Sequence, residues 1–410
     1  MGKSVPVTEM MVKEAYKKVK ANKGSAGVDK VSIEDFDKDK EGNLYKIWNR
    51  LSSGSYFPPP VREVEIPKGD GKVRKLGIPT VGDRIAQMVI KDYLEPRLEK
   101  EFSPNSYGYR PLKSTHEALA QVRRNCWLYN WVIDLDIKGF FDNISHEKLL
   151  LAIDKHVKEA WLKMYIKRWL EMPIEKANGE LIYKNGKGTP QGGVISPLLA
   201  NLFLHYALDK WLIQSYRNVR FVRYADDVIV HCRSKEQAEL VLEKIRTRLE
   251  ECELELHPEK TKIVYCKDHK RTGDYENVKF DFLGFSFKPR FSKTKDGYLF
   301  LGFDLAISTK SRKRILEVIR KTSFQRWSTN TIEGIAKELN PKIRGWINYY
   351  GKFRPSKLTS IFWHFHKRLI KWMKNKYKSL LGSTKRAYLM LKQVQQTQPT
   401  LFVHWVSGYK

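Results

Sequence analysis

The chain has 410 residues, enough for two or three domains with separate hydrophobic cores. It carries 76 Lys and Arg against 46 Asp and Glu, and this formal net charge of +30 predicts a polyanionic partner, with nucleic acid ahead of an anionic membrane surface. The longest apolar runs fall well short of the roughly 20 residues that cross a bilayer, so we expect no membrane span and no membrane partner.

Cysteines and the N-terminal segment bear on the cellular compartment. The 4 cysteines are widely spaced without a C-x-x-C pair, which argues against a zinc site and is typical of reduced, packed thiols. The N-terminal segment lacks the apolar stretch of a secretory signal, and Pro6 stands where a myristoylation signal has Ser or Thr. We therefore expect a cytoplasmic protein.

The sequence before residue 305 predicts mixed α/β structure. Residues 61–79 contain two alternating segments around a Gly-rich turn, VREVEIP, KGDGK and VRKLGIP, which predict a hairpin with a basic rim. Residues 131–137, WVIDLDI, predict a short strand on which Asp134 and Asp136 share one face. Ser145 is placed to cap the helix that follows.

Residues 132–265 predict an antiparallel sheet with helices on one face. In FVRYADDVIV, apolar runs flank Tyr224–Asp227, so this segment is expected to form the tip of a hairpin with Asp226 and Asp227 near one point. Residues 234–251 begin with a capping box and repeat apolar residues at helical spacing, which predicts a helix. The next segment, KIVYC, supplies further strand material.

The last quarter of the chain predicts a separate basic helical bundle. From Leu305 onward there are 23 Lys and Arg against 3 Glu and no Asp. Two segments have helical apolar spacing, TKSRKRILEVIRK and SIFWHFHKRLIKWMKNKYK. Five tryptophans can anchor a core: Trp327, Trp346, Trp363, Trp372 and Trp405. A merely solvated basic face is the alternative, which the scarcity of acidic residues disfavours.

The adjacent Asp226 and Asp227 require compensating positive charge, because ionised carboxylates are costly to remove from water. With Asp136 from the neighbouring strand they would form a set of hard oxygen ligands that suits Mg²⁺ or Mn²⁺. Two such ions about 3.5 to 4 Å apart can activate one oxygen and stabilise the leaving oxygen in phosphoryl transfer. An Asp-Asp pair at a turn is by itself most often turn chemistry, so the prediction depends on its neighbours.

The order of motifs along the chain resembles that of bacterial group II intron-encoded reverse transcriptases/maturases, and YADD resembles the reverse transcriptase catalytic box. The matching motifs span about residue 20 to the C-terminus and are GSAGVDKVS, IPKGDGKVRKLGIPTVGDRIAQ, SYGYRPLKSTHEAL, VIDLDIKGFFDNISHEKLL, GTPQGGVISPLLANLFLHYALD, RYADDVIV, LHPEKTKI, FDFLGFSF, LNPKIRGWINYY and LFVHW.

This resemblance implies an α+β right-hand polymerase, with fingers and a palm that contains the antiparallel sheet, followed by an α-helical thumb/maturase domain. The implied divisions are an N-terminal extension with fingers at 1–110, the palm with remaining fingers elements at 111–304, the thumb/maturase domain at 305–380, and a short C-terminal tail at 381–410. Longer family members end in a DNA-binding segment and a Cys-rich endonuclease module. Because the sequence stops soon after LFVHWVSGYK, we expect no endonuclease activity.

The resemblance also implies roles for single residues. Asp136, Asp226 and Asp227 would hold two Mg²⁺ ions, and the family pattern DIKGFFDN favours Asp136 over Asp134. Phe141 would be the gate that excludes a ribose 2′-OH, whereas Phe140 fits an ordinary core position. The other residues expected to bind dNTP or template–primer are Lys68, Arg74, Gln191, Lys262 and Gly284. Three residues are alternatives for these contacts: Lys72, Lys75 and Lys260.

The implied function is an RNA-directed DNA polymerase that copies intron RNA into cDNA and binds group II intron RNA to assist splicing and retromobility. Its partners would be the intron RNA, an RNA template with a DNA primer, dNTPs and target DNA, in a bacterial cytoplasm. One alternative is an RNA-binding maturase with a vestigial polymerase site, which the intact Asp136, Asp226, Asp227 and Gln191 disfavour. Another is a domesticated relative that serves DNA repair or phage defence, which the sequence separates poorly.

Overall fold

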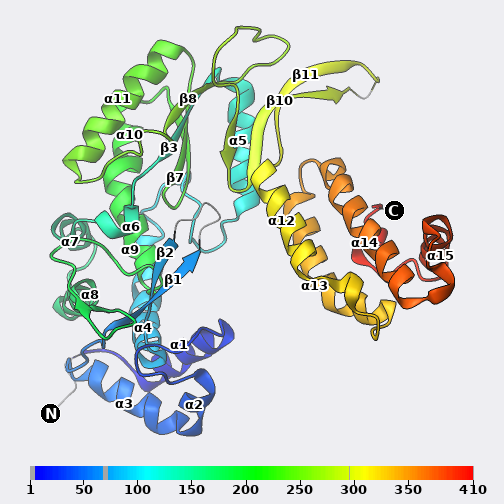
Figure 1. The fold of residues 1–410 in the computed structure, drawn as a ribbon. Coiled ribbons are helices and arrows are strands. Elements are labelled where there is room, and N and C mark those ends of the chain that lie inside the picture. Colours follow the sequence, from blue (N-terminus) through cyan, green and yellow to red (C-terminus); the bar gives the residue numbers. More distant parts are fainter. Residues whose placement is uncertain (1–4, 68–72, 295, 410) are drawn as a thin grey trace. The chain divides into compact units, whose positions relative to one another are not determined.

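The computed structural model describes residues 5–67, 73–294 and 296–409, and its chain forms two compact units (Figure 1). The first unit comprises Met1–Ala118 and Ile133–Ile263, and the second comprises Leu119–Val132 and Val264–Lys410. Helices and sheets both contribute, which confirms the predicted α+β class. Among the described residues, the helices lack the combination of length and apolar character that a bilayer span requires.

The N-terminal part of the first unit joins a group of helices to a small sheet. The helices are α1 (Glu9–Ala21), α2 (Ile33–Lys38), α3 (Lys40–Ser52) and α4 (Val81–Leu98), and α4 packs against α1 and α3. The predicted hairpin is confirmed, because β1 (Val61–Pro67) and β2 (Val73–Ile78) pair antiparallel. Short strands β4 (Ile174–Glu175) and β5 (Leu181–Ile182) extend the sheet in the order β2-β1-β4-β5. The turn at 68–72, with Lys68 and Lys72, lies outside the described residues.

The central sheet of the first unit has the strand order β6-β7-β3-β8. Its strands are β3 (Trp131–Asp136), β6 (Arg220–Tyr224), β7 (Asp227–Cys232) and β8 (Lys262–Tyr265). The helices of this region are α5 (Thr115–Leu128), α6 (Phe140–Asn143), α7 (His146–Asp154), α8 (Ala160–Glu171), α9 (Ser196–Leu204), α10 (Lys210–Ser215) and α11 (Lys235–Glu251). A π-helical turn, His205–Asp209, joins α9 to α10. In β7 every residue after Asp227 is buried, so the strand contributes to the core on both faces.

Local sequence signals determine how two of these helices begin. The prediction that Ser234 caps α11 is confirmed, because its hydroxyl accepts a hydrogen bond from the Gln237 backbone amide. The return bond differs from that of a capping box, since the Gln237 side chain accepts from the Arg233 amide rather than from the Ser234 amide. The prediction for α7 is wrong in its chemistry. Ser145 occupies the N-cap position, but its side chain makes no capping bond, and it instead helps to lower the pKa of Glu253.

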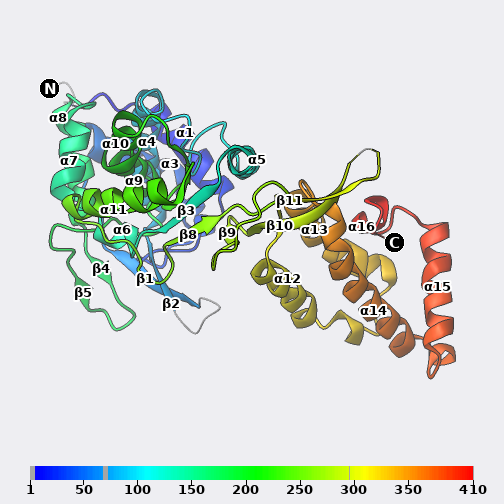
Figure 2. The same ribbon diagram turned by 90° about the horizontal axis from the view of Figure 1, so that it is seen from above.

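The second unit contains a three-stranded sheet ordered β11-β10-β9, formed by β9 (Phe280–Phe282), β10 (Phe285–Lys293) and β11 (Leu299–Ile307). The long β10–β11 hairpin is plain in Figure 2. It is anchored to residues 119–132: Arg123 pairs with Asp304 at 2.8 Å, and the Trp127 indole donates to the Phe303 carbonyl. These contacts explain why residues 119–132 belong to the same unit as this sheet. The helices that follow the sheet begin at Thr309, close to residue 305, where the sequence predicts a boundary.

The rest of the second unit is helical, as predicted, with α12 (Thr309–Lys321), α13 (Ile332–Tyr350), α14 (Thr359–Lys376), α15 (Thr384–Thr397) and α16 (Val403–Val406). Trp372 and Trp405 lie in its core, whereas Trp363 is 52% exposed. The core also contains Phe402 and Leu391. The segment after residue 380 therefore shares one core with the preceding helices, because its buried apolar side chains belong to the same cluster.

Candidate active site

The paired aspartates lie at the tip of the β6–β7 hairpin, as the sequence predicts. Tyr224 is opposite Asp227 in the antiparallel register, so Ala225 and Asp226 form the turn. Ala225 has a φ of +57°, in the left-handed region that residues other than glycine seldom adopt. This turn places the two carboxylates next to each other at one end of the sheet.

A second segment supports the back of this turn. The Arg223 amide donates to the Asn105 carbonyl at 2.9 Å, and the Tyr107 amide donates to the Arg223 carbonyl at 2.8 Å. At Gly108 a Cβ atom would lie 2.4 Å from the Ala225 nitrogen, so only glycine permits this approach. The SYGYRP motif therefore packs directly against the YADD turn.

Sequence reasoning missed the buried ion pair beneath the turn. The Arg223 guanidinium donates to both carboxylate oxygens of Asp209, at 2.8 and 2.6 Å, and both side chains are fully buried. It also donates to Asn201 Oδ1 at 2.9 Å and to the Ala225 carbonyl at 3.1 Å. One feature of the sequence indicates this ion pair. Arg223 is a charged residue that follows Val222 in a strand whose other residues are typical of a buried strand, so it needs a buried partner.

Asp136 ends β3, which is adjacent to β7 in the sheet. Its main chain is fixed to the loop before β8, because its carbonyl accepts from the His257 amide at 2.8 Å. Its carboxylate lies 3.2 and 3.3 Å from Lys260 Nζ. Lys260, one of the alternatives considered from the sequence, is thus in direct contact with a residue of the expected triad.

The charges of the three aspartates act on one another. Asp227 is open to solvent on one side, yet desolvation in its recess and the charges of Asp226 and Asp136 raise its pKa to about 7, while Lys260 opposes this. Desolvation also raises the pKa of Asp226, where the Asp136 charge adds to the effect and Arg74 opposes it. Negative charge is therefore crowded at this point.

Such a set of carboxylates fits a divalent cation, whose charge would stabilise the ionised forms. Among the described residues, no three His, Cys, Asp or Glu side chains are placed together so that they could hold a metal ion. In this structure Lys260 supplies the positive charge beside Asp136. The three carboxylates supply the hard oxygen ligands that divalent cations prefer.

Two predicted substrate-binding residues, 117 positions apart, contact each other. Arg74 Nε on β2 donates to Gln191 Oε1 at 2.8 Å, and Gln191 Nε2 lies 3.5 Å from Asp142 Oδ2. The main chain reinforces this contact, since the Gly77 amide donates to the Gln191 carbonyl at 2.8 Å. Gly192 has φ of +126°, and a Cβ there would lie 2.5 Å from the Gly77 oxygen. By contrast, Lys75 pairs with Glu63 at 3.2 Å.

The two phenylalanines after β3 occupy different environments. Phe140 is 2% exposed and packs against Phe203 and Phe141. Phe141 is 7% exposed, and its carbonyl accepts from the Thr189 amide just before Gln191. Phe141 therefore lies beside the expected nucleotide-binding loop, and its role as a gate stays a prediction.

The remaining predicted contacts are placed as follows. Lys262 Nζ lies 3.9 Å from Asp134 Oδ2 at the start of β8. Gly284, in the second unit, has φ of +80°, and its carbonyl accepts from the Ser311 hydroxyl at 3.0 Å. The Tyr349 hydroxyl donates to the neighbouring Leu283 carbonyl at 2.8 Å, so this turn is fixed to the helical bundle. The roles of both residues stay predictions.

A buried polar cluster on α4 was also missed. Asp83 is fully buried and accepts from the Tyr56 hydroxyl and the Trp169 indole at Oδ1, and from Gln87 Nε2 at Oδ2. Gln87 Oε1 accepts in turn from the Ile195 amide at 3.2 Å. This chain of bonds connects α8 and α4 to the loop that carries Gln191. The motif DRIAQ contains the residues, but nothing local showed that both would be buried.

Comparison with known proteins agrees with this geometry. Residues 66–287 match the family described as Reverse transcriptase (RNA-dependent DNA polymerase), and residues 312–389 match Group II intron, maturase-specific domain. The group II intron-encoded protein LtrA of Lactococcus lactis subsp. cremoris is 28% identical over 422 residues, covering 82% of this chain and 68% of that protein. Protein YkfC of Escherichia coli (strain K12) is 32% identical over 263 residues, covering 55% of this chain and 68% of that protein.

A solved structure of a truncated apo telomerase from Candida tropicalis aligns with a TM-score of 0.46 at 16% identity, covering 64% of this chain and 60% of that one. The family match spans more than half of the chain, including all three aspartates, the Arg74–Gln191 contact and Phe141. The chain belongs to the reverse transcriptase family and is an RNA-dependent DNA polymerase with a maturase-specific domain.

Proposed function

We propose that this reverse transcriptase copies group II intron RNA into cDNA by two-metal-ion nucleotidyl transfer and binds that RNA to assist splicing and retromobility. The observation that carries the polymerase half is the grouping of Asp136, Asp226 and Asp227 at one end of the central sheet. The maturase-specific match at residues 312–389 and the similarity to LtrA support the intron half.

Asp136, Asp226 and Asp227 would hold two Mg²⁺ ions, for which Mn²⁺ is a chemical substitute. When bound, the ions would favour ionisation of the primer 3′-OH and offset charge on the departing pyrophosphate. Lys260 would release the Asp136 carboxylate as the cations take over its compensating charge. Its ammonium group would then be free to contact a phosphate.

The other residues would position the nucleotide. Arg74, oriented by its bond to Gln191, would donate charge-assisted hydrogen bonds to the triphosphate, with Lys68 as a second cation expected from the resemblance. Phe141 would lie under the sugar and collide with a 2′-OH. In this arrangement the 3′ oxygen attacks the α-phosphorus, the bond to the β-phosphate oxygen breaks, and pyrophosphate departs.

The implied partners are an RNA template with a DNA primer, dNTPs, the intron RNA and the target DNA. The described helices of the second unit supply a basic surface, with no acidic residue in the first turn of α12 or α14. Positive charge of this kind tracks a phosphate backbone.

Primer extension tests the polymerase half. The intact protein should extend a DNA primer on an RNA template with Mg²⁺ and dNTPs, and Asp226→Ala/Asp227→Ala should abolish extension while RNA affinity stays within a few fold. The matched control is Glu239→Ala/Glu243→Ala, which removes two exposed carboxylates of α11 that only pair with neighbouring cations. The proposal fails if the aspartate variant still extends, or if the control loses activity to the same degree.

Splicing of a group II intron RNA, with and without protein, tests the maturase half. The intact protein and the aspartate variant should both accelerate splicing, because RNA binding does not require the polymerase site. If neither protein affects splicing while the intact protein extends primers, the maturase role is wrong. The alternative of a domesticated reverse transcriptase is then favoured. If splicing is assisted but the intact protein never extends, the polymerase half is lost.

A further inference from the structure

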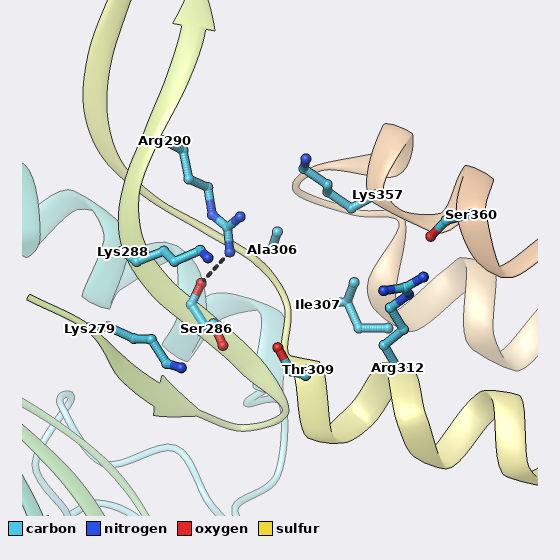
Figure 3. Close-up of a pocket in the computed structure, with 10 residues that line it drawn as sticks. All are labelled: Lys279, Ser286, Lys288, Arg290, Ala306, Ile307, Thr309, Arg312, Lys357 and Ser360. Atoms are coloured by element: carbon cyan, nitrogen blue, oxygen red, sulfur yellow. Dashed lines mark hydrogen bonds between the residues drawn. The ribbon is translucent and has the colours of Figure 1, made fainter.

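A pocket of about 330 Å³ opens in the second unit, between the base of the β10–β11 hairpin, the start of α12 and the turn before α14 (Figure 3). Cationic side chains dominate its lining: Lys279, Lys288, Arg290, Arg312 and Lys357. None of the described residues that line it is acidic. Figure 3 shows Lys279, Lys288 and Arg290 on one side, with Arg312 and Lys357 on the other.

The protein orients one of the five cationic side chains by hydrogen bonds, and the other four make no such bonds with the described residues. Arg290 donates to the Asp304 and Ser286 backbone carbonyls at 3.2 and 3.1 Å, and these neutral acceptors orient its guanidinium. Among the described residues, Lys279, Lys288, Arg312 and Lys357 form no side-chain hydrogen bond or ion pair with the protein. Arg312 Nε is buried without a partner. Buried donors normally have an acceptor, so an external acceptor fits here.

The charges in the pocket repel one another. Desolvation lowers the pKa of Lys288, and Arg290, Lys279 and Lys357 lower it further. Two acids outside the lining, Asp281 and Asp304, offset part of this repulsion, since Asp281 acts on Lys288 and both act on Arg290. Asp281 accepts a hydrogen bond from the Ser286 hydroxyl, and Asp304 pairs with Arg123 at 2.8 Å. An anion in the pocket would relieve this repulsion.

Helix α12 adds to the positive potential. Thr309, which lines the pocket, is its first residue, and the first turn contains no acidic side chain. Free backbone amides and the helix dipole make such an end favourable for anions. Thr309 and Ser360 contribute hydroxyl groups that can donate to oxygen.

We propose that this pocket binds a phosphodiester group of the nucleic-acid backbone. A phosphate offers several acceptor oxygens to donors from three segments, which matches a pocket that several cations share. The contact would position the nucleic acid without reading its sequence. The proposal extends the function above and requires only that the chain binds nucleic acid, and the phosphate could come from the template–primer duplex or from folded intron RNA.

The test uses the full chain with Lys288→Gln/Arg312→Gln. The matched control is Lys235→Gln/Lys244→Gln, which removes two exposed charges from α11 of the first unit. Affinity for an RNA–DNA template–primer duplex is measured without dNTPs over a series of KCl concentrations. The pocket variant should bind about tenfold more weakly, as expected for charge-assisted bonds. Its log–log salt slope should be smaller by about 1, while the control stays within about twofold.

A second set of binding measurements, on the duplex and on folded intron RNA separately, shows which nucleic acid provides the phosphate. If binding is lost on the duplex alone, the phosphate belongs to the template–primer, and loss on folded intron RNA alone assigns it to the intron. Each phosphate of the duplex is replaced in turn by a neutral methylphosphonate. At one position this replacement should weaken binding to the intact protein but not to the pocket variant, which already lacks the contact. Equal affinities and equal salt slopes for pocket variant and control on both nucleic acids would overturn the proposal.

Two further variants guard against misfolding. Lys357→Gln changes an exposed side chain that makes no bond with the described protein, and it should weaken binding in the same direction without altering the melting temperature. Lys288→Arg/Arg312→Lys keeps the charge and should bind nearly normally. Binding is read without polymerisation, so this test can succeed or fail independently of the Asp226→Ala/Asp227→Ala extension assay.

Discussion

The Arg223 guanidinium donates a hydrogen bond to the Ala225 carbonyl at 3.1 Å, inside the turn that carries Asp226 and Asp227. The same guanidinium is held by Asp209 through two bonds and by Asn201 through a third. Ala225 has a left-handed φ of +57°, a conformation that needs support from its surroundings. The buried pair therefore stabilises the conformation of the aspartate turn.

Asp209→Ala should destabilise the protein by about 3 to 5 kcal/mol, because it leaves the buried Arg223 charge without its partner. Urea denaturation measures the loss. The control is Glu243→Ala, which breaks the exposed contact with Arg246 and should cost less than about 1 kcal/mol. Similar losses for both variants would show that the buried pair has no special role.

Arg74→Ala should raise the KM for dNTP by about tenfold or more, because a charge-assisted donor to the triphosphate is lost. Gln191→Ala should raise it as well, and the double variant should cost less than the two single effects combined, since the residues bond each other at 2.8 Å. Lys75→Ala is the control, because Lys75 pairs with Glu63. Steady-state kinetics measure these KM values. If the free-energy effects of the two single substitutions simply add in the double variant, Arg74 and Gln191 do not act together on the nucleotide.

Phe141→Ala should increase ribonucleotide incorporation relative to deoxynucleotide incorporation, because the ring that excludes a 2′-OH is removed. Competition between matched rNTP and dNTP on one template measures the ratio. Phe140→Ala should leave the ratio unchanged and instead destabilise the fold by about 3 to 5 kcal/mol, as a truncated core aromatic does. An unaltered ratio in Phe141→Ala would remove this residue as the gate.

Folding stability should depend on pH through Asp83. Burial raises the pKa of Asp83 to about 6. Hydrogen bonds from Trp169, Gln87 and Tyr56 oppose this rise, because they favour the charged carboxylate. The folded protein therefore binds this proton more tightly than the unfolded chain does, so the Asp83 contribution to stability falls as pH rises from about 4 to 6 and is constant above. Over that interval the change should be about 3 kcal/mol.

Asp83→Asn should flatten this dependence, because an amide does not titrate. Its oxygen can still accept from Tyr56 and Trp169, so the difference between pH 4 and pH 7, rather than absolute stability, is the quantity to compare by urea denaturation. An identical pH difference in the variant and the intact protein would assign the effect to other groups.

Several features follow from the sequence alone because short-range interactions determine them. Helix α11 begins where Ser234 and Gln237 predict it, since capping involves neighbouring residues. The β1–β2 and β6–β7 hairpins follow from alternating side chains around turn residues. The candidate triad also came from the sequence, because two of its members are adjacent and the third follows a short strand in a recognisable motif.

Only the tertiary structure decided which distant residues meet. The Arg74–Gln191 bond spans 117 positions, the Asp209–Arg223 pair depends on packing between the turn after α9 and β6, and the basic pocket gathers side chains from several separate elements. The Ser145 side chain, which local rules assign to a helix cap, makes no capping bond. Local propensities set the elements, but long-range partners depend on how apolar faces pack and on which polar groups burial forces to pair.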